Sequence, residues 1–241
     1  MNNYGVFARF YDSLCENVDY EVRSDYISDF FNAENKNEPK LLDLACGTGE
    51  FTKCFKGKGF NVTGMDLSSD MLTVAKEKVP DAEFLLGDMR SFDFGNSFDF
   101  CICCLDSLNH LTDKNDWKSC FESVYKSLSK DGVFVFDVNT VFKHNFVLAD
   151  NSFIFDEEDF FLAWDNELTD ENKVRIFLDF FIFNGKNYDR HSEQFDELAI
   201  PTEEITEMLK EYFIIDGIYD DLSNSAEKAD SERIYFVCKR K

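Results

Sequence analysis

The residues best suited to hold a ligand lie in the stretch Asp43-Leu44-Ala45-Cys46-Gly47-Thr48-Gly49. A short apolar run comes before the glycines, and Phe51, Cys54 and Phe55 follow them at helical spacing. The stretch therefore predicts a strand, a glycine turn and a helix. Glycines in such a turn let the backbone bend sharply and let a ligand approach it closely.

A carboxylate after the next apolar run adds to this pattern. Residues 60–66 predict a second strand that ends in Asp66, 17 residues after Gly49. A carboxylate at this place can accept hydrogen bonds from both hydroxyls of a ribose. A nicotinamide dinucleotide site would have a third glycine three residues after Gly49, where this chain has Thr52. That difference weakens the dinucleotide interpretation.

The segment from Asp43 to Gly49 closely resembles the glycine motif of the class I S-adenosylmethionine-dependent methyltransferases. Gly87-Asp88-Met89-Arg90 looks most like the branch of that family that methylates amines of sugars and other small molecules. The resemblance covers roughly residues 4 to 140 and is specific at the cofactor and weak at the substrate. It implies S-adenosylmethionine as cofactor, a methyltransferase activity and a small-molecule acceptor.

Ligands of a parallel α/β sheet bind beyond the carboxyl ends of its strands, where several candidate side chains would meet. Asp66 would bind the ribose, and Asp88 would accept from the adenine amine; a turn or helix cap is the alternative for Asp88. Leu67 and Met89 would enclose the adenine ring. The residues expected to bind the cofactor are Tyr11, Ala45, Gly47, Gly49, Asp66, Leu67, Met71, Asp88, Met89 and Leu105.

The catalytic candidates follow the fourth predicted strand, in the loop from Leu105 to Leu111. In the fold that the resemblance implies, this loop lies beside the methionine part of the cofactor and faces the acceptor. His110 is a candidate general base because imidazole titrates near neutral pH, although it can also be a capping or packed histidine. Asp106 is the second candidate, and could instead bind an ammonium group.

The first 32 residues predict two helices. On the first, one face carries Tyr4, Phe7, Tyr11 and Leu14. The segment from Phe7 to Leu14 resembles the N-terminal signature of many small-molecule methyltransferases, in which this helix folds over the cofactor like a lid. Tyr11 would then face the cofactor, whereas ordinary core packing is its alternative role.

Between residues 40 and 140, strands alternate with helices, which predicts a parallel, doubly wound sheet. We expect Asp131-Gly132 to make the turn into the fifth strand, residues 133–138. After Thr140, alternating apolar residues and an Asn184-Gly185 hairpin turn predict an antiparallel sheet. A helix follows, and two further strands then complete the main sheet. We therefore expect a Rossmann-like α/β fold with a seven-stranded sheet. Residues 1–140 and 199–241 would form the methyltransferase domain, and residues 141–198 an inserted β subdomain for the substrate.

The composition of the chain limits the kinds of molecule that it is expected to bind. The net charge is 25 − 48 = −23, which disfavours nucleic acid as a substrate and gives no support for an anionic membrane surface. The eight cysteines show no metal-ligand spacing, so we expect no metal and interpret Cys101-Ile102-Cys103-Cys104 as core residues. We found no signal-like or membrane-spanning apolar run, and therefore expect a cytoplasmic protein with reduced thiols.

Two alternatives from other classes stay open at this point. One is a dinucleotide-dependent oxidoreductase, against which Thr52 argues. The other is a regulatory protein that binds S-adenosylmethionine without catalysis, although the inserted sheet argues mildly for a catalyst. The sequence leaves open the acceptor, the methylated atom and the oligomeric state.

Overall fold

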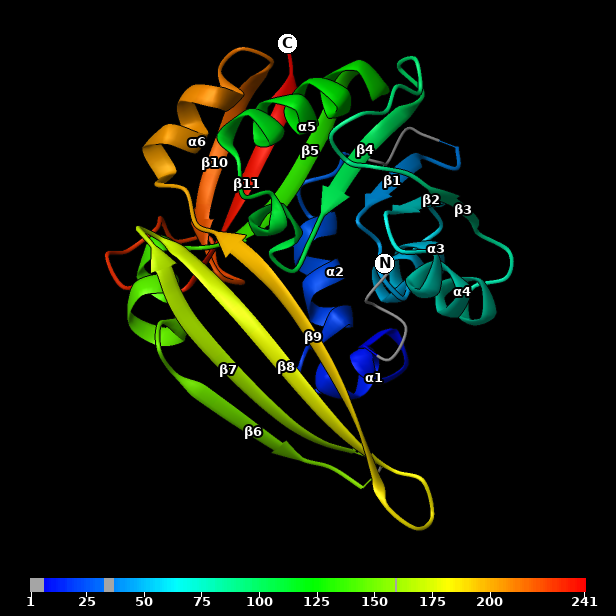
Figure 1. The fold of residues 1–241 in the computed structure, drawn as a ribbon. Helices are drawn as coiled ribbons and strands as arrows, with labels where there is room; N and C mark the ends of the chain where they lie inside the picture. The colour runs from blue at the N-terminus through cyan, green and yellow to red at the C-terminus, as the bar shows by residue number, and fades with distance from the viewer. Residues whose placement is uncertain (1–6, 33–36, 159) are drawn as a thin grey trace.

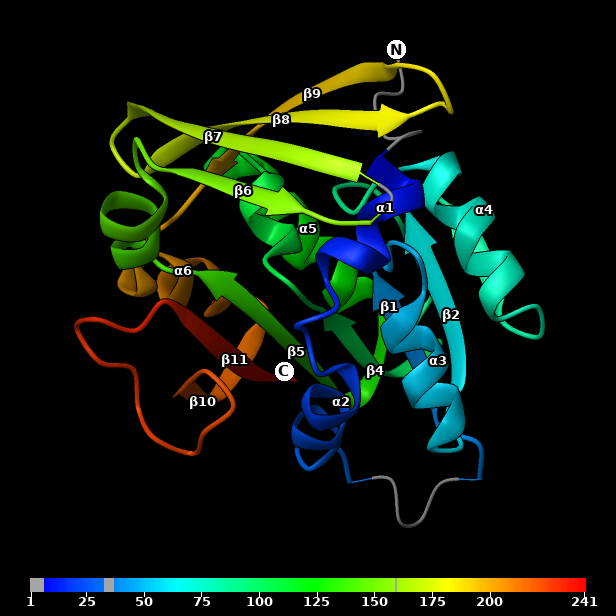
Figure 2. The same cartoon turned by 90° about the horizontal axis from the view of Figure 1, so that it is seen from below.

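The computed structural model describes residues 7–32, 37–158 and 160–241. The chain forms two β-sheets, and helices cover both faces of the larger one (Figure 1). Seen from below, the smaller sheet lies across the end of the larger sheet toward which the parallel strands point (Figure 2). This arrangement leaves the carboxyl ends of those strands facing the smaller sheet. Among the described residues, none of the helices combines the length and apolar character needed to cross a bilayer.

The larger sheet has the strand order β10-β11-β5-β4-β1-β2-β3, which confirms the predicted seven-stranded fold. Strand β11 is antiparallel to both of its neighbours, and the pairs among β1 to β5 are parallel. The strands are β1 (Lys40–Leu44), β2 (Asn61–Asp66), β3 (Glu83–Leu86), β4 (Phe98–Cys103), β5 (Leu128–Asn139), β10 (Phe213–Asp220) and β11 (Arg233–Arg240).

Strand β5 begins earlier than the sequence predicts. We expected a turn at Asp131-Gly132, but the strand runs through this point from Leu128. Asp131 has a φ of 64°, and the register against β4 shifts between Phe98 and Phe100. The turn chemistry of the Asp-Gly pair thus produces an irregularity inside the strand rather than its start.

The two faces of the larger sheet are covered by different helices, because its central strands are apolar on both sides. Phe134 and Phe136 of β5 pack in one core cluster with α5 (Lys114–Ser127) and α6 (Thr202–Leu209). Val133 and Val135 pack on the other side with α2 (Tyr20–Ser28) and α3 (Glu50–Gly57). The cysteines of β4 are buried in these clusters, as predicted.

Two further helices flank the ligand-facing end of the sheet. Helix α4 (Ser69–Lys78) begins where the Ser68 hydroxyl accepts the Met71 N–H, at 3.3 Å. Helix α1 (Phe7–Leu14) packs on α4, and the Lys78 ammonium lies 2.7 Å from the Asp12 carboxylate. The predicted N-terminal helix therefore forms, and Tyr4 lies outside the described residues.

The smaller sheet has the order β6-β7-β8-β9 with every pair antiparallel. Its strands are β6 (Ser152–Asp156), β7 (Phe160–Asp170), β8 (Lys173–Phe183) and β9 (Tyr188–Leu198). The β8–β9 turn spans residues 184–187, where the Asn184 N–H donates to the Asn187 carbonyl and Gly185 has a φ of 92°. Alternate residues of β8, such as Ile176 and Phe180, build its core.

Two short helical segments were not predicted from the sequence. A 3₁₀-helix, η1 (Ser107–His110), lies in the loop after β4, and a π-helix, η2 (Lys143–Leu148), follows β5. Each is shorter than two turns, so apolar periodicity cannot reveal it. Both segments matter below, because they carry His110 and His144.

Candidate functional site

The loop after β1 has left-handed backbone at three predicted site positions. The φ angles of Ala45, Gly47 and Gly49 are 57°, 53° and 82°. A Cβ added to Gly49 would lie 3.1 Å from the Ala75 Cβ of α4, so this glycine lets the loop pack against that helix. A Cβ on Gly47 would meet no atom within 4 Å, so this glycine borders open space.

Asp66 at the end of β2 joins this loop to the next one. Its Oδ2 accepts the Gly47 N–H and its Oδ1 accepts the Ser68 N–H, each at 2.8 Å. Burial raises the pKa of the Asp66 carboxyl, although the two N–H donors act in the opposite direction. Each carboxylate oxygen can accept a further hydrogen bond, which leaves capacity for ligand hydroxyls.

Thr52, which counted against a dinucleotide site, has a structural partner. Its hydroxyl Oγ1 donates to Oδ2 of the buried Asp43 at 2.5 Å. Burial raises the pKa of Asp43 to about 7, while the bond from Thr52 lowers it. Burial therefore favours the protonated form of a carboxyl group inside the glycine motif.

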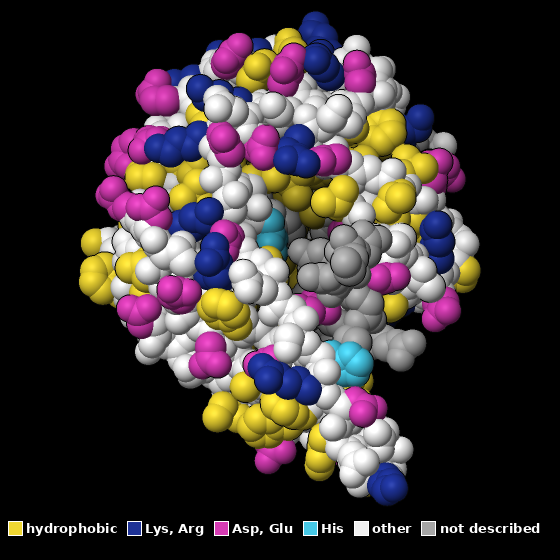
Figure 3. All heavy atoms as spheres, in the orientation of Figure 1, with side chains coloured by type: hydrophobic (Ala, Val, Ile, Leu, Met, Phe, Trp, Pro, Cys, Tyr) yellow, Lys and Arg dark blue, Asp and Glu magenta, His cyan; other side chains and the backbone are white. Residues whose placement is uncertain are grey.

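A cavity of about 500 Å³ opens at the carboxyl ends of β1, β2 and β3. Figure 3 shows this face hollowed between the larger sheet and the smaller one, with a histidine side chain visible in the hollow. His110 lines one side, and Gln194, Phe195 and Asp196 of β9 line another. The predicted cofactor residues in its wall are Ala45, Asp66, Leu67, Asp88 and Met89.

A second, smaller cavity of about 30 Å³ shares Ala45 with the first. Tyr11, Gly47 and Leu105 line it, which brings α1, the glycine loop and the end of β4 together. Burial raises the pKa of the Tyr11 hydroxyl well above its ordinary value. Of the other predicted residues, Gly49, Met71 and Asp106 line neither of these two cavities.

Asp88 is held by a neighbour that the sequence analysis did not consider. The Arg90 guanidinium binds both oxygens of Asp88, with Nε to Oδ1 at 2.9 Å and Nη2 to Oδ2 at 2.5 Å. This arginine lowers the pKa of Asp88, so the carboxylate stays ionised. Arg90 also lies 3.1 Å from Asp116. The predicted adenine acceptor thus forms one edge of an ion-pair network on the cavity wall.

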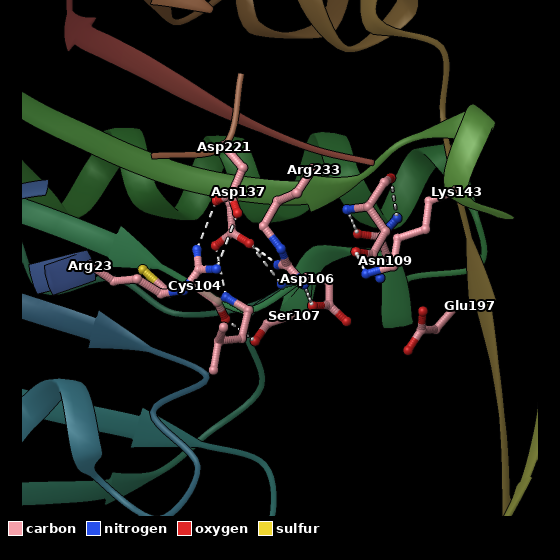
Figure 4. Close-up of polar contacts among 12 residues, drawn as sticks. Arg23, Cys104, Asp106, Ser107, Asn109, Asp137, Lys143, Glu197, Asp221 and Arg233 are labelled. Carbon is pink, nitrogen blue, oxygen red and sulfur yellow. Dashed lines mark hydrogen bonds and ion pairs between the residues drawn. The ribbon is translucent and has the colours of Figure 1, made fainter. Parts of the chain in front are cut away.

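Asp106 belongs to a buried charge network (Figure 4). Arg233 of β11 lies 2.5 Å from the Asp106 carboxylate and also binds Asp137 of β5. Asp137 in turn accepts the N–H groups of Leu105 and Asp106, at 2.7 and 3.2 Å. Burial opposes ionisation of Asp106, but Arg233 and Lys143 lower its pKa to about 2. The network fixes the loop after β4, where Leu105 and Asp106 have φ angles of 54° and 52°.

Glu197, which was not predicted from the sequence as a site residue, lies between His110 and a second histidine, His144. The His110 Nε2 lies 3.8 Å from Glu197 Oε1, and the His144 Nε2 lies 3.6 Å from Glu197 Oε2. Glu197 is 4% exposed and His144 is fully buried. The signal that could have revealed Glu197 is its place on the inward face of a polar strand, which depends on strand register.

Comparison with known proteins places the chain in a family. A family model described as a methyltransferase domain matches residues 41–132. The Bacillus subtilis protein YqeM, named as a methyltransferase, is 37% identical over 98% of this chain and 97% of its own length. A dTDP-3-amino-3,4,6-trideoxy-alpha-D-glucopyranose N,N-dimethyltransferase of Streptomyces venezuelae is 32% identical over 54% of each chain.

A solved structure agrees over the full length. An S-adenosylmethionine-dependent methyltransferase from Clostridium acetobutylicum has a TM-score of 0.88 and 34% identity, covering 98% of both chains. The match includes the smaller sheet as well as the larger one, because it covers 98% of both chains. These matches confirm the expected family and cofactor, and the chain belongs to the S-adenosylmethionine-dependent methyltransferases.

Proposed function

We propose that this methyltransferase transfers a methyl group to a nitrogen atom of a small-molecule amine. The observation that carries the proposal is the composition of the larger cavity wall. Residues expected to bind the nucleoside share one cavity with His110 and with the end of β9. Cofactor and acceptor would therefore meet under the smaller sheet, which makes residues 141–198 the substrate-binding subdomain.

The residues present fit S-adenosylmethionine. Asp66 has carboxylate lone pairs left for the ribose hydroxyls, and Leu67 and Met89 are apolar walls of the same cavity. Gly47 borders open space beside the smaller cavity, where Tyr11 and Leu105 would enclose the methionine part. The bound cofactor supplies a methyl group already activated by a sulfonium centre.

The chain's own residues then have two tasks. They must hold the acceptor nitrogen in line with the methyl carbon and the sulfur, and they must exclude water. An ammonium acceptor must also lose a proton before its lone pair can attack. His110 lies at the cavity wall in a position to take that proton, and Asp106 is occupied by Arg233. Asp106 would accordingly shape the site rather than bind the acceptor directly.

The charge of the cavity favours an amine over a polyanion. Its described walls carry four carboxylates, Asp66, Asp88, Asp116 and Asp196. Arg90 pairs with Asp88 and Asp116, and Arg175 and Lys173 pair with Asp196, which leaves Asp66 as the wall carboxylate held by backbone N–H groups. An excess of carboxylates in the wall attracts an ammonium group. The N,N-dimethyltransferase of Streptomyces venezuelae supports nitrogen as the methylated atom, since its name specifies an amino sugar.

A set of matched acceptors tests this proposal. The purified protein with S-adenosylmethionine would be offered a free amino sugar, the corresponding hydroxyl sugar, a dTDP-linked amino sugar and a short duplex DNA. Mass spectrometry of the acceptor then detects added methyl groups. We expect methylation of an amino sugar and none of its hydroxyl counterpart. Methylation of the hydroxyl sugar, or of DNA alone, would contradict the proposal.

A further inference from the structure

Glu197 occupies an unusual position on the inner face of the smaller sheet. It stands opposite Val174 of β8, in a register where the neighbouring strand contributes core residues. Its side chain is 5% exposed, and its Oε2 has no hydrogen-bond partner among the described residues. Figure 4 shows the carboxylate reaching from β9 toward the side on which Asp106 and Lys143 lie. A buried carboxylate without a donor is costly, so this oxygen needs a proton or a charged partner.

His144 supplies that partner only if an extra proton is present. Its Nδ1 lies 3.0 Å from the carbonyl oxygen of Asn172, which can only accept a hydrogen bond. The proton of a neutral ring is therefore held at Nδ1, and a lone pair at Nε2 would face Glu197 Oε2 at 3.6 Å. A proton placed between Nε2 and Oε2 removes this conflict, whether it is closer to nitrogen or to oxygen.

The other oxygen of Glu197 acts on His110. The His110 Nε2 faces Oε1 at 3.8 Å, and its ring lies against the Phe195 ring with centroids 5.0 Å apart. A carboxylate at Nε2 favours the tautomer that carries its proton there, which leaves a basic Nδ1 for the acceptor in the cavity. At 3.8 Å the two groups form an ion-pair contact that is longer than a hydrogen bond.

The other charged residues described near Glu197 do not supply the hydrogen-bond donor that its Oε2 lacks. Lys143 of η2 interacts with Glu197 over a longer range, and its Nζ donates to Asn139 Oδ1 at 3.0 Å. His110 also faces the fields of Asp66 and Asp106. Asp106 is already neutralised by Arg233, so Glu197 is the carboxylate most able to orient the His110 ring.

We propose that Glu197 and His144 share one buried proton, and that Glu197 thereby positions His110 with Nδ1 free to accept a proton from the acceptor. This inference rests on the proposed amine methylation for its catalytic meaning. In the reaction, the acceptor nitrogen forms a bond to the methyl carbon while the carbon–sulfur bond breaks and its electron pair stays on sulfur. The proton lost by nitrogen goes to His110 Nδ1. Glu197 and His144 are positioning residues, because they act through His110.

Nuclear magnetic resonance of the imidazole nitrogens tests the shared proton without cofactor or acceptor. The chain has three histidines, so variants assign each ring in a ¹⁵N-labelled protein. At neutral pH we expect the His144 Nε2 to carry a proton or to accept one from Glu197 Oε2. Glu197→Gln should abolish that signal, because an amide N–H can donate to a neutral His144 ring. It should also shift the His110 ring away from the tautomer with its proton on Nε2.

A matched variant separates this role from general packing. Glu193→Gln removes another buried carboxylate from the same face of β9, four residues away, and should leave the His144 and His110 spectra unchanged. A bare His144 Nε2 lone pair in the parent protein, with the same spectrum in Glu197→Gln, would overturn the inference. That result would not affect the proposed acceptor class, which the acceptor screen tests independently.

Steady-state kinetics supply the catalytic readout. With the best acceptor found, Glu197→Gln should lower kcat by roughly tenfold to a hundredfold, move the acid limb of the pH–rate profile and leave the cofactor KM nearly unchanged. Glu197→Asp should restore part of the rate. A fall in rate with an unchanged pH profile, or an equal fall in Glu193→Gln, would contradict the positioning role.

Discussion

Thr48 in the glycine loop donates its hydroxyl proton to the Asp12 carboxylate of α1, with Oγ1 and Oδ1 2.6 Å apart. The other Asp12 oxygen lies 2.7 Å from the Lys78 ammonium, which also lies 2.6 Å from Glu50. One aspartate therefore attaches the N-terminal helix both to the glycine loop and to the end of α4. Cofactor binding and the order of α1 should be coupled through this contact.

Hydrogen exchange tests whether α1 acts as a lid. We expect exchange over residues 7–14 to slow when S-adenosylmethionine is added, because the helix would close over it. Thr48→Val keeps the side-chain shape and removes the donor, and should speed exchange in α1 in the free protein. Thr73→Val, at an exposed position of α4 where the hydroxyl donates to the Ser69 carbonyl of its own helix, is the control. Equal exchange in α1 with and without cofactor would instead assign Tyr11 to ordinary core packing.

Loss of the Asp66 carboxylate should weaken cofactor binding. Asp66→Ala removes charge-assisted hydrogen bonds to the ribose, so calorimetry should show a loss of about 1.5–3 kcal/mol, or roughly tenfold to a hundredfold in affinity. Because Asp66 also accepts two backbone N–H groups, circular dichroism must first show a folded variant. Asp70→Ala changes a nearby carboxylate outside both cavities and should leave affinity intact. Unchanged affinity in folded Asp66→Ala would remove the ribose assignment.

The raised pKa of Asp43 predicts a loss of stability as the pH rises. The folded protein holds this proton up to a pKa of about 7, whereas the unfolded chain releases it near its ordinary value. The protonated Asp43 therefore contributes its full stabilisation below about pH 4, and this contribution is lost as the pH rises through about 7. The free energy of unfolding should fall by about 2–4 kcal/mol over this range.

Urea denaturation at several pH values measures this effect. Asp43→Asn keeps an acceptor for Thr52 and cannot ionise, so its unfolding free energy should change less between pH 4 and 8 than that of the parent. Asp81→Asn alters an exposed carboxylate and should follow the parent curve. Parallel curves for Asp43→Asn and the parent would show that Asp43 does not titrate in this range.

Arg233 should contribute strongly to stability. Its side chain is 13% exposed and forms ion pairs with both Asp106 and Asp137. Arg233→Met would leave two buried carboxylates without their cation and should cost about 3–5 kcal/mol in the free energy of unfolding. Arg190→Met breaks an exposed pair with Asp179 and should cost at most about 1 kcal/mol. Similar losses in the two variants would argue against a central role for the buried network.

A comparison of pH–rate profiles tests whether His110 is the general base. If His110 takes the acceptor proton, His110→Asn should lower kcat by about 10²–10⁴-fold and leave cofactor affinity nearly intact. An acceptor that arrives as a neutral amine should reduce that loss, because no proton has to be removed before attack. His191→Asn, on β9, is the control. The same acid limb in parent and His110→Asn would exclude His110 as the base.

The sequence alone predicted the larger sheet, its strand boundaries within a few residues and the inserted antiparallel sheet. These features depend on local signals: alternation or periodicity of apolar residues, the glycine turn after β1 and the Ser68 cap of α4. The motif from Asp43 to Gly49 also predicted the family and the cofactor, because a close approach of backbone to ligand restricts residue types locally. Only the start of β5 and two short helices departed from these signals.

Tertiary structure decided which polar groups act together. Asp106 was selected as a catalytic candidate by its place after β4, but Arg233, 127 positions later, occupies its carboxylate. His144 had no argument from sequence, and Glu197 was an unremarked residue of a polar strand. Strand register brings Glu197 beside His110, and the turn at Asn172 holds His144 beside Glu197. Contacts between residues far apart in the chain leave no local pattern, so the protonation partners in this site follow only from the folded structure.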